Sequence, residues 1–157
     1  MATYYVATTG NDSNPGTEAE PFLTLQRANN ALSAGDTVIV EDGTYTGTGT
    51  LVLTITKSGT AGNWITFKAR NAHQAIVDGE NRDRYACIGF SGTSQYVRIE
   101  GFRLKEGRHR GFSLGGNSNN DAPKNIEIVN NIIHDIGRYV TNDNRVAHSG
   151  AFTSPFA

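Results

Sequence analysis

Residues 103–110 carry a dense group of basic side chains. The run Arg103-Leu-Lys-Glu-Gly-Arg-His-Arg110 holds four Lys or Arg residues against one Glu, a local charge of +3. Such a group attracts an anionic ligand, and a Lys, Arg or His within it could take part in proton transfer. We therefore take this run as the first candidate site. Its catalytic candidates are Lys105 and Arg108, and its substrate-binding candidates are Glu106, His109 and Arg110.

The sequence repeats itself with a shift of 29 residues. Apolar residues of segment 125–135 fall on those of segment 96–106, as Ile128 does on Ile99. Within each copy the apolar residues alternate, which is the period of a strand with one buried face. Self-similarity at such a period indicates a solenoid, and because the repeated pieces are strands, the pattern predicts a parallel β-helix.

The same shift brings further side chains to the candidate site. His134 and Asp135 fall at the positions of Lys105 and Glu106, one coil later. Adjacent strands lie about 4.8 Å apart, so we expect Lys105 and His134 to be near neighbours. His134 therefore joins the catalytic candidates, and Asp135 and Arg138 join those for substrate binding. The alternative is that all of these are solvated turn residues.

A second polar cluster, residues 78–84, is rich in carboxylates. It contains Asp78, Glu80 and Asp83 together with two arginines. Ca²⁺ prefers several converging oxygen ligands, so these three carboxylates are the candidate metal ligands and Ca²⁺ the candidate cofactor. However, the segment lacks the regular Asp spacing of a dedicated calcium loop. Internal ion pairs are the alternative.

We interpret the chain as one all-β domain. Residues 1–35 are expected to form a strand, a loop and a capping helix, 36–139 the coils, and 140–157 an incomplete last coil or tail. The helix is indicated by apolar residues at helical spacing, followed by Gly35 as a natural stop: Leu25, Ala28, Ala31 and Leu32. Short strands between turns could also form an antiparallel sandwich. The repeat and the opening helix favour the β-helix.

The composition argues against several classes of protein. A net charge of −1 at pH 7 gives no global field that would attract nucleic acid or an anionic membrane. No apolar run approaches membrane-spanning length. The single cysteine, Cys87, cannot form an internal disulfide and is interpreted as a small buried strand residue. The first residues have no basic or hydrophobic region, so no signal peptide is predicted.

Three motifs near the start resemble the opening of pectate lyase-like proteins with a right-handed parallel β-helix. They are Tyr-Tyr-Val-Ala-Thr-Thr-Gly-Asn-Asp-Ser-Asn-Pro-Gly-Thr at 4–17, Pro-Phe-Leu-Thr-Leu-Gln-Arg-Ala at 21–28 and Ala-Gly-Asp-Thr-Val-Ile-Val-Glu-Asp-Gly-Thr-Tyr at 34–45. The resemblance implies a right-handed single-stranded β-helix, an acidic polysaccharide as substrate and a secreted location. Members of this family are usually longer, so a truncated or short form with few coils is expected.

The resemblance also implies a chemistry, β-elimination on uronic-acid polysaccharides. This reaction requires Ca²⁺ or basic side chains to neutralise the sugar carboxylate, and a Lys, Arg, His or Tyr to remove the adjacent proton. Trp64 and Tyr85 could stack on sugar rings. Two alternatives stay open: a noncatalytic module that binds glycans or is structural, and a β-helix that forms homo-oligomers through an uncapped C-terminal coil.

Overall fold

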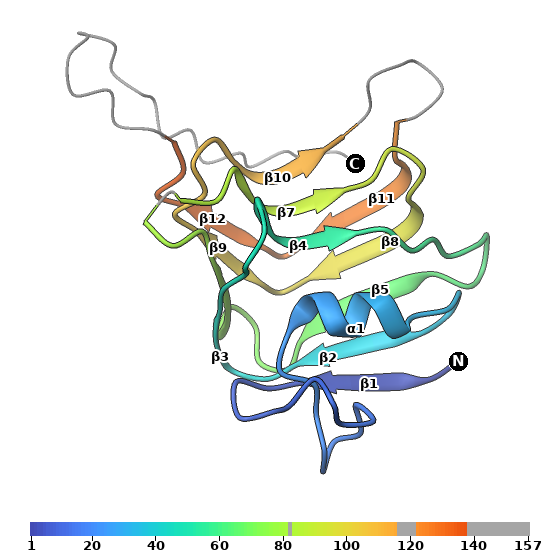
Figure 1. Ribbon diagram of the computed structural model, residues 1–157. Helices are drawn as coiled ribbons and strands as arrows, with labels where there is room; N and C mark the ends of the chain where they lie inside the picture. The colour runs from blue at the N-terminus through green and yellow to red at the C-terminus, as the bar shows by residue number, and fades with distance from the viewer. Residues whose placement is uncertain (82, 116–121, 138–157) are drawn as a thin grey trace, which may run out of the picture.

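The structure, a computed structural model, describes residues 1–81, 83–115 and 122–137. In this part of the chain the strands form three parallel sheets, of five, four and three strands (Figure 1). The five-stranded sheet contains β1 (Thr3–Val6), β2 (Thr37–Val40), β5 (Ile65–Ala69), β8 (Gln95–Glu100) and β11 (Lys124–Val129). The four-stranded sheet contains β3 (Gly43–Tyr45), β6 (Ala75–Asp78), β9 (Arg103–Lys105) and β12 (Ile132–His134). The three-stranded sheet contains β4 (Leu51–Ile55), β7 (Ala86–Phe90) and β10 (Arg110–Leu114).

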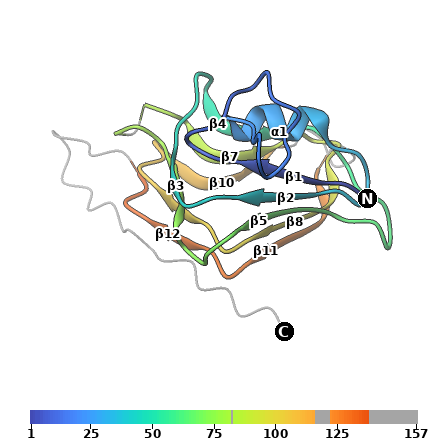
Figure 2. The ribbon, with the colours of Figure 1, turned by 90° about the horizontal axis from the view of Figure 1, so that it is seen from below.

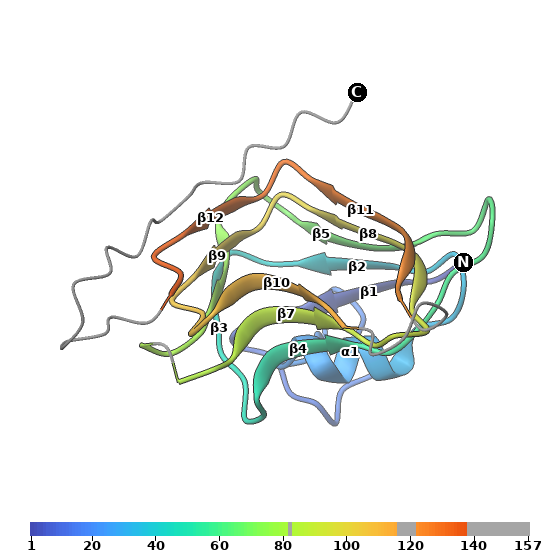
Figure 3. The same ribbon diagram turned by 90° about the horizontal axis from the view of Figure 1, so that it is seen from above.

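The chain visits these sheets in a fixed order, which confirms the parallel β-helix. From β2 onward each coil passes from the five-stranded to the four-stranded and then to the three-stranded sheet, as Figure 3 shows from above. Every strand pairs in parallel with the corresponding strand of the next coil. Between β8 and β11, Ile128 pairs with Ile99, and Arg98 bonds Glu127 across the expected separation of 29 residues.

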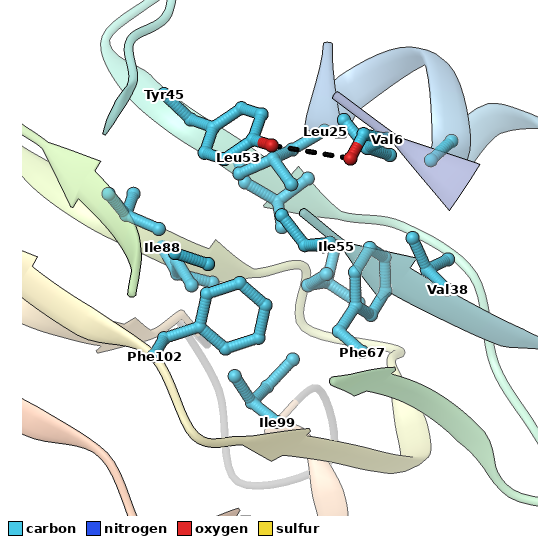
Figure 4. Packing of buried hydrophobic residues seen from close by; sticks show 14 of the residues in the cluster. Val6, Leu25, Val38, Tyr45, Leu53, Ile55, Phe67, Ile88, Ile99 and Phe102 are labelled. Carbon is cyan, nitrogen blue, oxygen red and sulfur yellow. Dashed lines mark hydrogen bonds between the residues drawn. The ribbon is translucent and has the colours of Figure 1, made fainter. Parts of the chain in front are cut away.

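The core is a set of apolar columns along the axis of the stack. Val38 pairs in register with Phe67, and Phe67 pairs with Ile99. Each of these side chains is at most 1% exposed, and Figure 4 shows them pointing into the same interior. Complete burial of such a side chain stabilises a fold by about 1.5–3 kcal/mol. Because the columns depend on register, the core and the strand pairing reinforce each other.

The predicted helix exists and caps the three-stranded sheet, but its C-terminal end was predicted wrongly. Helix α1 spans Leu25–Ala31 and ends before Gly35, because Leu32 already has an extended backbone. The Thr24 side chain accepts a hydrogen bond from the Arg27 amide and so caps the N-terminus. Figure 2 shows α1 at the first-coil end of the stack, beside β4.

Side-chain amides of α1 occupy the free edge of β4. The Thr54 amide donates to Gln26 Oε1 at 2.9 Å, and Gln26 Nε2 donates to the Thr54 carbonyl at 3.2 Å. The Thr56 amide donates to Asn29 Oδ1 at 3.3 Å, and Asn29 is fully buried. An unpaired strand edge invites association with another chain. The helix removes that liability at the first coil.

The turn-rich opening covers a second edge, that of β1. The Tyr5 amide donates to the Gly16 carbonyl at 2.9 Å, and the Phe22 amide donates to the Tyr5 carbonyl at 2.9 Å. The Ala7 amide in turn donates to the Phe22 carbonyl at 2.9 Å. Residues 10–22 therefore act as a substitute strand, which explains why an irregular segment is held in a defined place.

The Asn130-Asn131 pair has a structural role. Asn131 Oδ1 accepts a hydrogen bond from the Phe102 amide at 2.8 Å, and Asn131 Nδ2 donates to the Ile99 carbonyl at 2.9 Å. Asn130 has a φ of 51°, in the left-handed region that asparagine tolerates well. The pair thus fixes the corner between β11 and β12 onto the coil below it.

We predict that Asn131→Ala lowers the free energy of unfolding by about 1–3 kcal/mol, because it leaves two backbone groups without their partners. Chemical denaturation monitored by circular dichroism measures this change. Gln95→Ala is the matched control, since Gln95 is exposed on β8. Equal stability of the two variants would contradict the role assigned to Asn131.

Candidate functional site

The candidate site is a column of charged side chains on the four-stranded sheet. Asp78, Lys105 and His134 are register partners on β6, β9 and β12. Lys105 Nζ lies 3.0 Å from Asp78 Oδ2 and 3.9 Å from Glu106 Oε1. The expected proximity of Lys105 and His134 is therefore confirmed. Asp78, which the sequence suggested as a metal ligand, instead pairs with the lysine.

The charge state of Lys105 follows from these neighbours. The hydrogen bond to Asp78 is the largest cause that raises the pKa of Lys105, and the charges of Asp78, Glu106 and Asp135 raise it further. Because the pKa is raised, Lys105 is an ammonium group at neutral pH. An ammonium can bind a carboxylate with its three donors, but it has no lone pair with which to accept a proton. The geometry thus favours electrostatic binding by Lys105 over a role as a base.

His134 has a different partner. Its Nδ1 lies 2.7 Å from Asp135 Oδ2, so the carboxylate orients the imidazole ring. When Nδ1 carries the proton that is donated to Asp135, Nε2 holds the lone pair that can accept another proton. The His134 side chain is 39% exposed and so is reachable by a ligand. Of the three catalytic candidates, His134 has the contacts best suited to a base.

Glu106 and Asp135 occupy equivalent turn positions. Their φ values are 57° and 52°, in the left-handed region. Glu106 Oε2 also accepts a hydrogen bond from the Asn81 amide at 2.8 Å. The two carboxylates therefore begin successive turns with the same backbone geometry, and each flanks a basic residue of the column.

Arg108, His109 and Arg110 lie on the other side of the turn and form a second group. The Arg108 amide donates to the Arg84 carbonyl at 2.7 Å, and the His109 amide donates to the Tyr85 carbonyl at 3.0 Å. The Tyr85 ring centre is 4.9 Å from that of His109, and the Arg110 guanidinium lies 5.9 Å from the Tyr85 ring centre. Tyr85 is 38% exposed. The group combines donors with an accessible aromatic face.

The three candidate metal ligands do not converge. Glu80 Oε2 lies 2.6 Å from Arg84 Nη2, Asp83 Oδ2 lies 3.7 Å from Arg84 Nη1, and Asp78 pairs with Lys105. Among the described residues no three His, Cys, Asp or Glu side chains are grouped so that they could hold a metal ion. Asp78, Glu80 and Asp83 are instead held in ion pairs, which is the alternative that the sequence left open. Arg138 and the tail 140–157 lie outside the described residues.

A family model described as "Pel9A-like, right handed beta helix region" matches residues 4–154. The chain belongs to this family. Pectate lyase L from Dickeya dadantii is 31% identical over 124 residues, which are 74% of this chain and 29% of that protein. This chain therefore spans less than a third of the length of that relative.

Solved structures agree with this assignment. A rhamnogalacturonan lyase superposes with a TM-score of 0.56 at 30% sequence identity, over 67% of this chain and 29% of that one. Pectate lyase Pel9A superposes with a TM-score of 0.54 at 23% identity, over 71% of this chain and 33% of that one. The chain is thus related to β-helix polysaccharide lyases, and its β-helix is right-handed. No helix in the described part of the chain is long and apolar enough to cross a membrane.

Cys87 is confirmed as a buried strand residue and is not a nucleophile. It is fully buried on β7, and its Sγ donates to the Lys105 carbonyl at 3.2 Å. Burial is the largest cause that raises the pKa of its thiol to about 12. The reactive form of cysteine is the thiolate, which burial disfavours. Cys87 therefore contributes packing beneath the site.

We predict that Cys87 resists a thiol reagent in the folded protein at pH 8. With a pKa of about 12, the thiolate fraction there is on the order of one in ten thousand. Labelling with dithionitrobenzoate checks this: slow reaction in buffer and rapid reaction in denaturant are expected. Because the folded pKa is raised, the reaction in buffer should accelerate as the pH approaches 12. Fast labelling at pH 8 without denaturant would contradict the burial of this thiol.

Proposed function

We propose that this protein acts on acidic polysaccharides by β-elimination, with the charged column as the contact for a uronate. Membership of a family with pectate and rhamnogalacturonan lyase relatives supports the reaction class. The single observation that carries the assignment to these residues is the placement of an ammonium, Lys105, in register with the His134–Asp135 pair. The reaction needs both kinds of group side by side.

The roles follow from the charge states. Lys105 binds the uronate carboxylate and withdraws charge from the adjacent carbon, which makes its proton more acidic. His134 Nε2 takes that proton, while Asp135 stabilises the imidazolium that forms. The electron pair of the broken C–H bond forms a carbon–carbon double bond, and the glycosidic C–O bond breaks. The departing oxygen takes a proton from water, and Arg108, in the turn that follows Lys105, stabilises its charge.

Binding is supported by a second group of residues. Tyr85 offers an exposed ring for the apolar face of a sugar, and Arg110 and His109 lie against that ring. Arg110 and Arg108 add charge that suits a polyanion. The three candidate metal ligands, Asp78, Glu80 and Asp83, are held in ion pairs, so the proposed roles belong to the side chains alone. Calcium dependence and secretion stay predictions.

A noncatalytic glycan-binding module is the second candidate. It is favoured by the ion pair of Lys105 with Asp78, since an ammonium that stays charged binds an anion without any proton transfer. Self-association is the third candidate. Its motivation is an exposed apolar side chain on the last described strand of each sheet: Leu114, Ile128 and Ile132. Ultracentrifugation over a range of protein concentrations tests that alternative, and a monomer at every concentration would remove it.

We predict that Lys105→Ala weakens binding of trigalacturonate about fivefold, because one partly exposed charge pair of roughly 1 kcal/mol is lost. Isothermal titration calorimetry measures the change in Kd. Lys124→Ala is the matched control, since it removes the same charge from an exposed position on β11. A larger effect of the control would place the acidic ligand elsewhere. Thermal melts of both variants exclude unfolding as the cause.

We also predict that the protein generates unsaturated uronate from pectate, alginate or chondroitin, seen as rising ultraviolet absorbance. His134→Ala should abolish the rise, and Lys105→Ala should slow it by about 100-fold, as expected when a charge-stabilising donor is removed. Flat traces on all three substrates, together with retained trigalacturonate binding, would overturn catalysis and establish the noncatalytic candidate. Parallel runs with calcium and with EDTA test the metal prediction.

A further inference from the structure

A groove of about 1010 Å³ lies at the first-coil end of the molecule, away from the charged column. One wall is formed by residues 44–54, the segment that leads from β3 into β4. The other wall is formed by Thr8, Asp12 and Leu23 and by side chains of α1. Its volume is in the range of ligand-binding clefts. None of the candidate residues from the sequence lines it except Glu80.

Hydroxyl groups dominate the lining. Threonine is its commonest residue type, and four of the threonines alternate along residues 44–50: Thr44, Thr46, Thr48 and Thr50. All four are exposed, and within the described residues none of their hydroxyls hydrogen-bonds to the protein. Each hydroxyl is both a donor and an acceptor. The wall therefore presents a row of unused groups of the kind that match sugar hydroxyls.

The charged residues that line the groove sum to zero, so the groove does not attract a polyanion. Its charged lining residues are two carboxylates and two guanidiniums, and all of them have partners. Asp12 Oδ1 accepts hydrogen bonds from the Leu23 and Thr24 amides at 2.9 Å each. Arg84 Nη2 forms an ion pair with Glu80 Oε2 at 2.6 Å. Arg27 donates to the Asp12 carbonyl at 3.1 Å. An uncharged ligand suits this lining better than an acidic one.

Both walls are held in place before any ligand arrives. Arg84 Nη1 donates to the Gly49 carbonyl at 2.8 Å, which ties the threonine segment to the next coil. A Cβ on Gly47 would lie 2.7 Å from Val52 Cα, so the segment packs tightly on β4. A fixed wall loses little entropy on binding. Leu23, which is 42% exposed, adds an apolar surface for the C–H face of a sugar ring.

We propose that this groove binds a neutral oligosaccharide segment. Hydrogen bonds between coils link the groove to the basic turn: the Tyr85 amide donates to the Thr50 carbonyl at 2.8 Å, and the Arg108 amide donates to the Arg84 carbonyl at 2.7 Å. Groove residues and the basic turn are therefore one coil apart. If the proposed function holds, a single glycan lies along the stack, with its uncharged part beside α1 and its uronate at Lys105. Binding of a neutral oligosaccharide in the groove does not itself depend on the proposed lyase activity.

The test is calorimetric titration of the full chain with xylotetraose, cellotetraose and β-1,4-galactotetraose, and separately with trigalacturonate. We expect at least one neutral tetrasaccharide to bind. The double variant Thr46→Val/Thr48→Val should weaken that binding about tenfold, because it removes two hydroxyls without changing side-chain shape. Thr93→Val, at an exposed turn outside the groove, is the matched control and should bind as the unaltered protein does.

Two further variants separate this inference from the proposed function. Thr48→Trp should block the groove and abolish neutral binding, whereas Lys105→Ala should lower trigalacturonate binding only. Absence of binding by all three neutral tetrasaccharides, or neutral binding that none of the groove variants alters, would overturn the groove assignment. Binding of trigalacturonate alone, weakened by Thr48→Trp, would overturn the neutral class. Circular dichroism melts show whether each variant is folded.

Discussion

Backbone pairing between successive coils is the interaction on which the rest of the structure depends. A middle coil satisfies its amides and carbonyls on both sides, but the first coil has a neighbour on one side only. The N-terminal segment solves this problem twice. Residues 10–22 bond to β1 through the backbone, and α1 bonds to β4 through the side chains of Gln26 and Asn29. These contacts close the edges of β1 and β4 at the first coil.

In-register pairing also determines which side chains meet. It stacks Val38, Phe67 and Ile99 into an apolar column inside the helix, and it stacks charged residues outside. On the outer face of the five-stranded sheet, Arg98 bonds Glu127 at 2.8 Å from one coil to the next. On the four-stranded sheet the same geometry places Lys105 between Asp78 and His134. The charge state of a site residue is thus set by a residue one coil away.

Much of the fold was predictable from the sequence. The alternating apolar residues of β8 recur in β11 at a constant shift of 29 residues, and this repeat indicates stacked strands. The Lys105–His134 contact follows from that same shift. The contacts of Asp78 and Tyr85 were missed because the coils differ in length, so the shift of 29 residues aligns neither Asp78 with Lys105 nor Tyr85 with His109. The end of α1 was missed because Leu32 continues the apolar stripe while its backbone is already extended. Side-chain spacing alone does not reveal that change.

The unequal turns have a consequence for how such a protein can change over time. The segments that join the four-stranded to the three-stranded sheet carry the basic residues, the aromatic ring and the threonine wall, while the interior is supplied by the strands. Surface loops tolerate changes in length far better than packed strands do. Ligand preference can therefore diverge one turn at a time, with the folding information left intact. A stack of this kind behaves as a modular scaffold, in which each coil offers an independent place for selection to act.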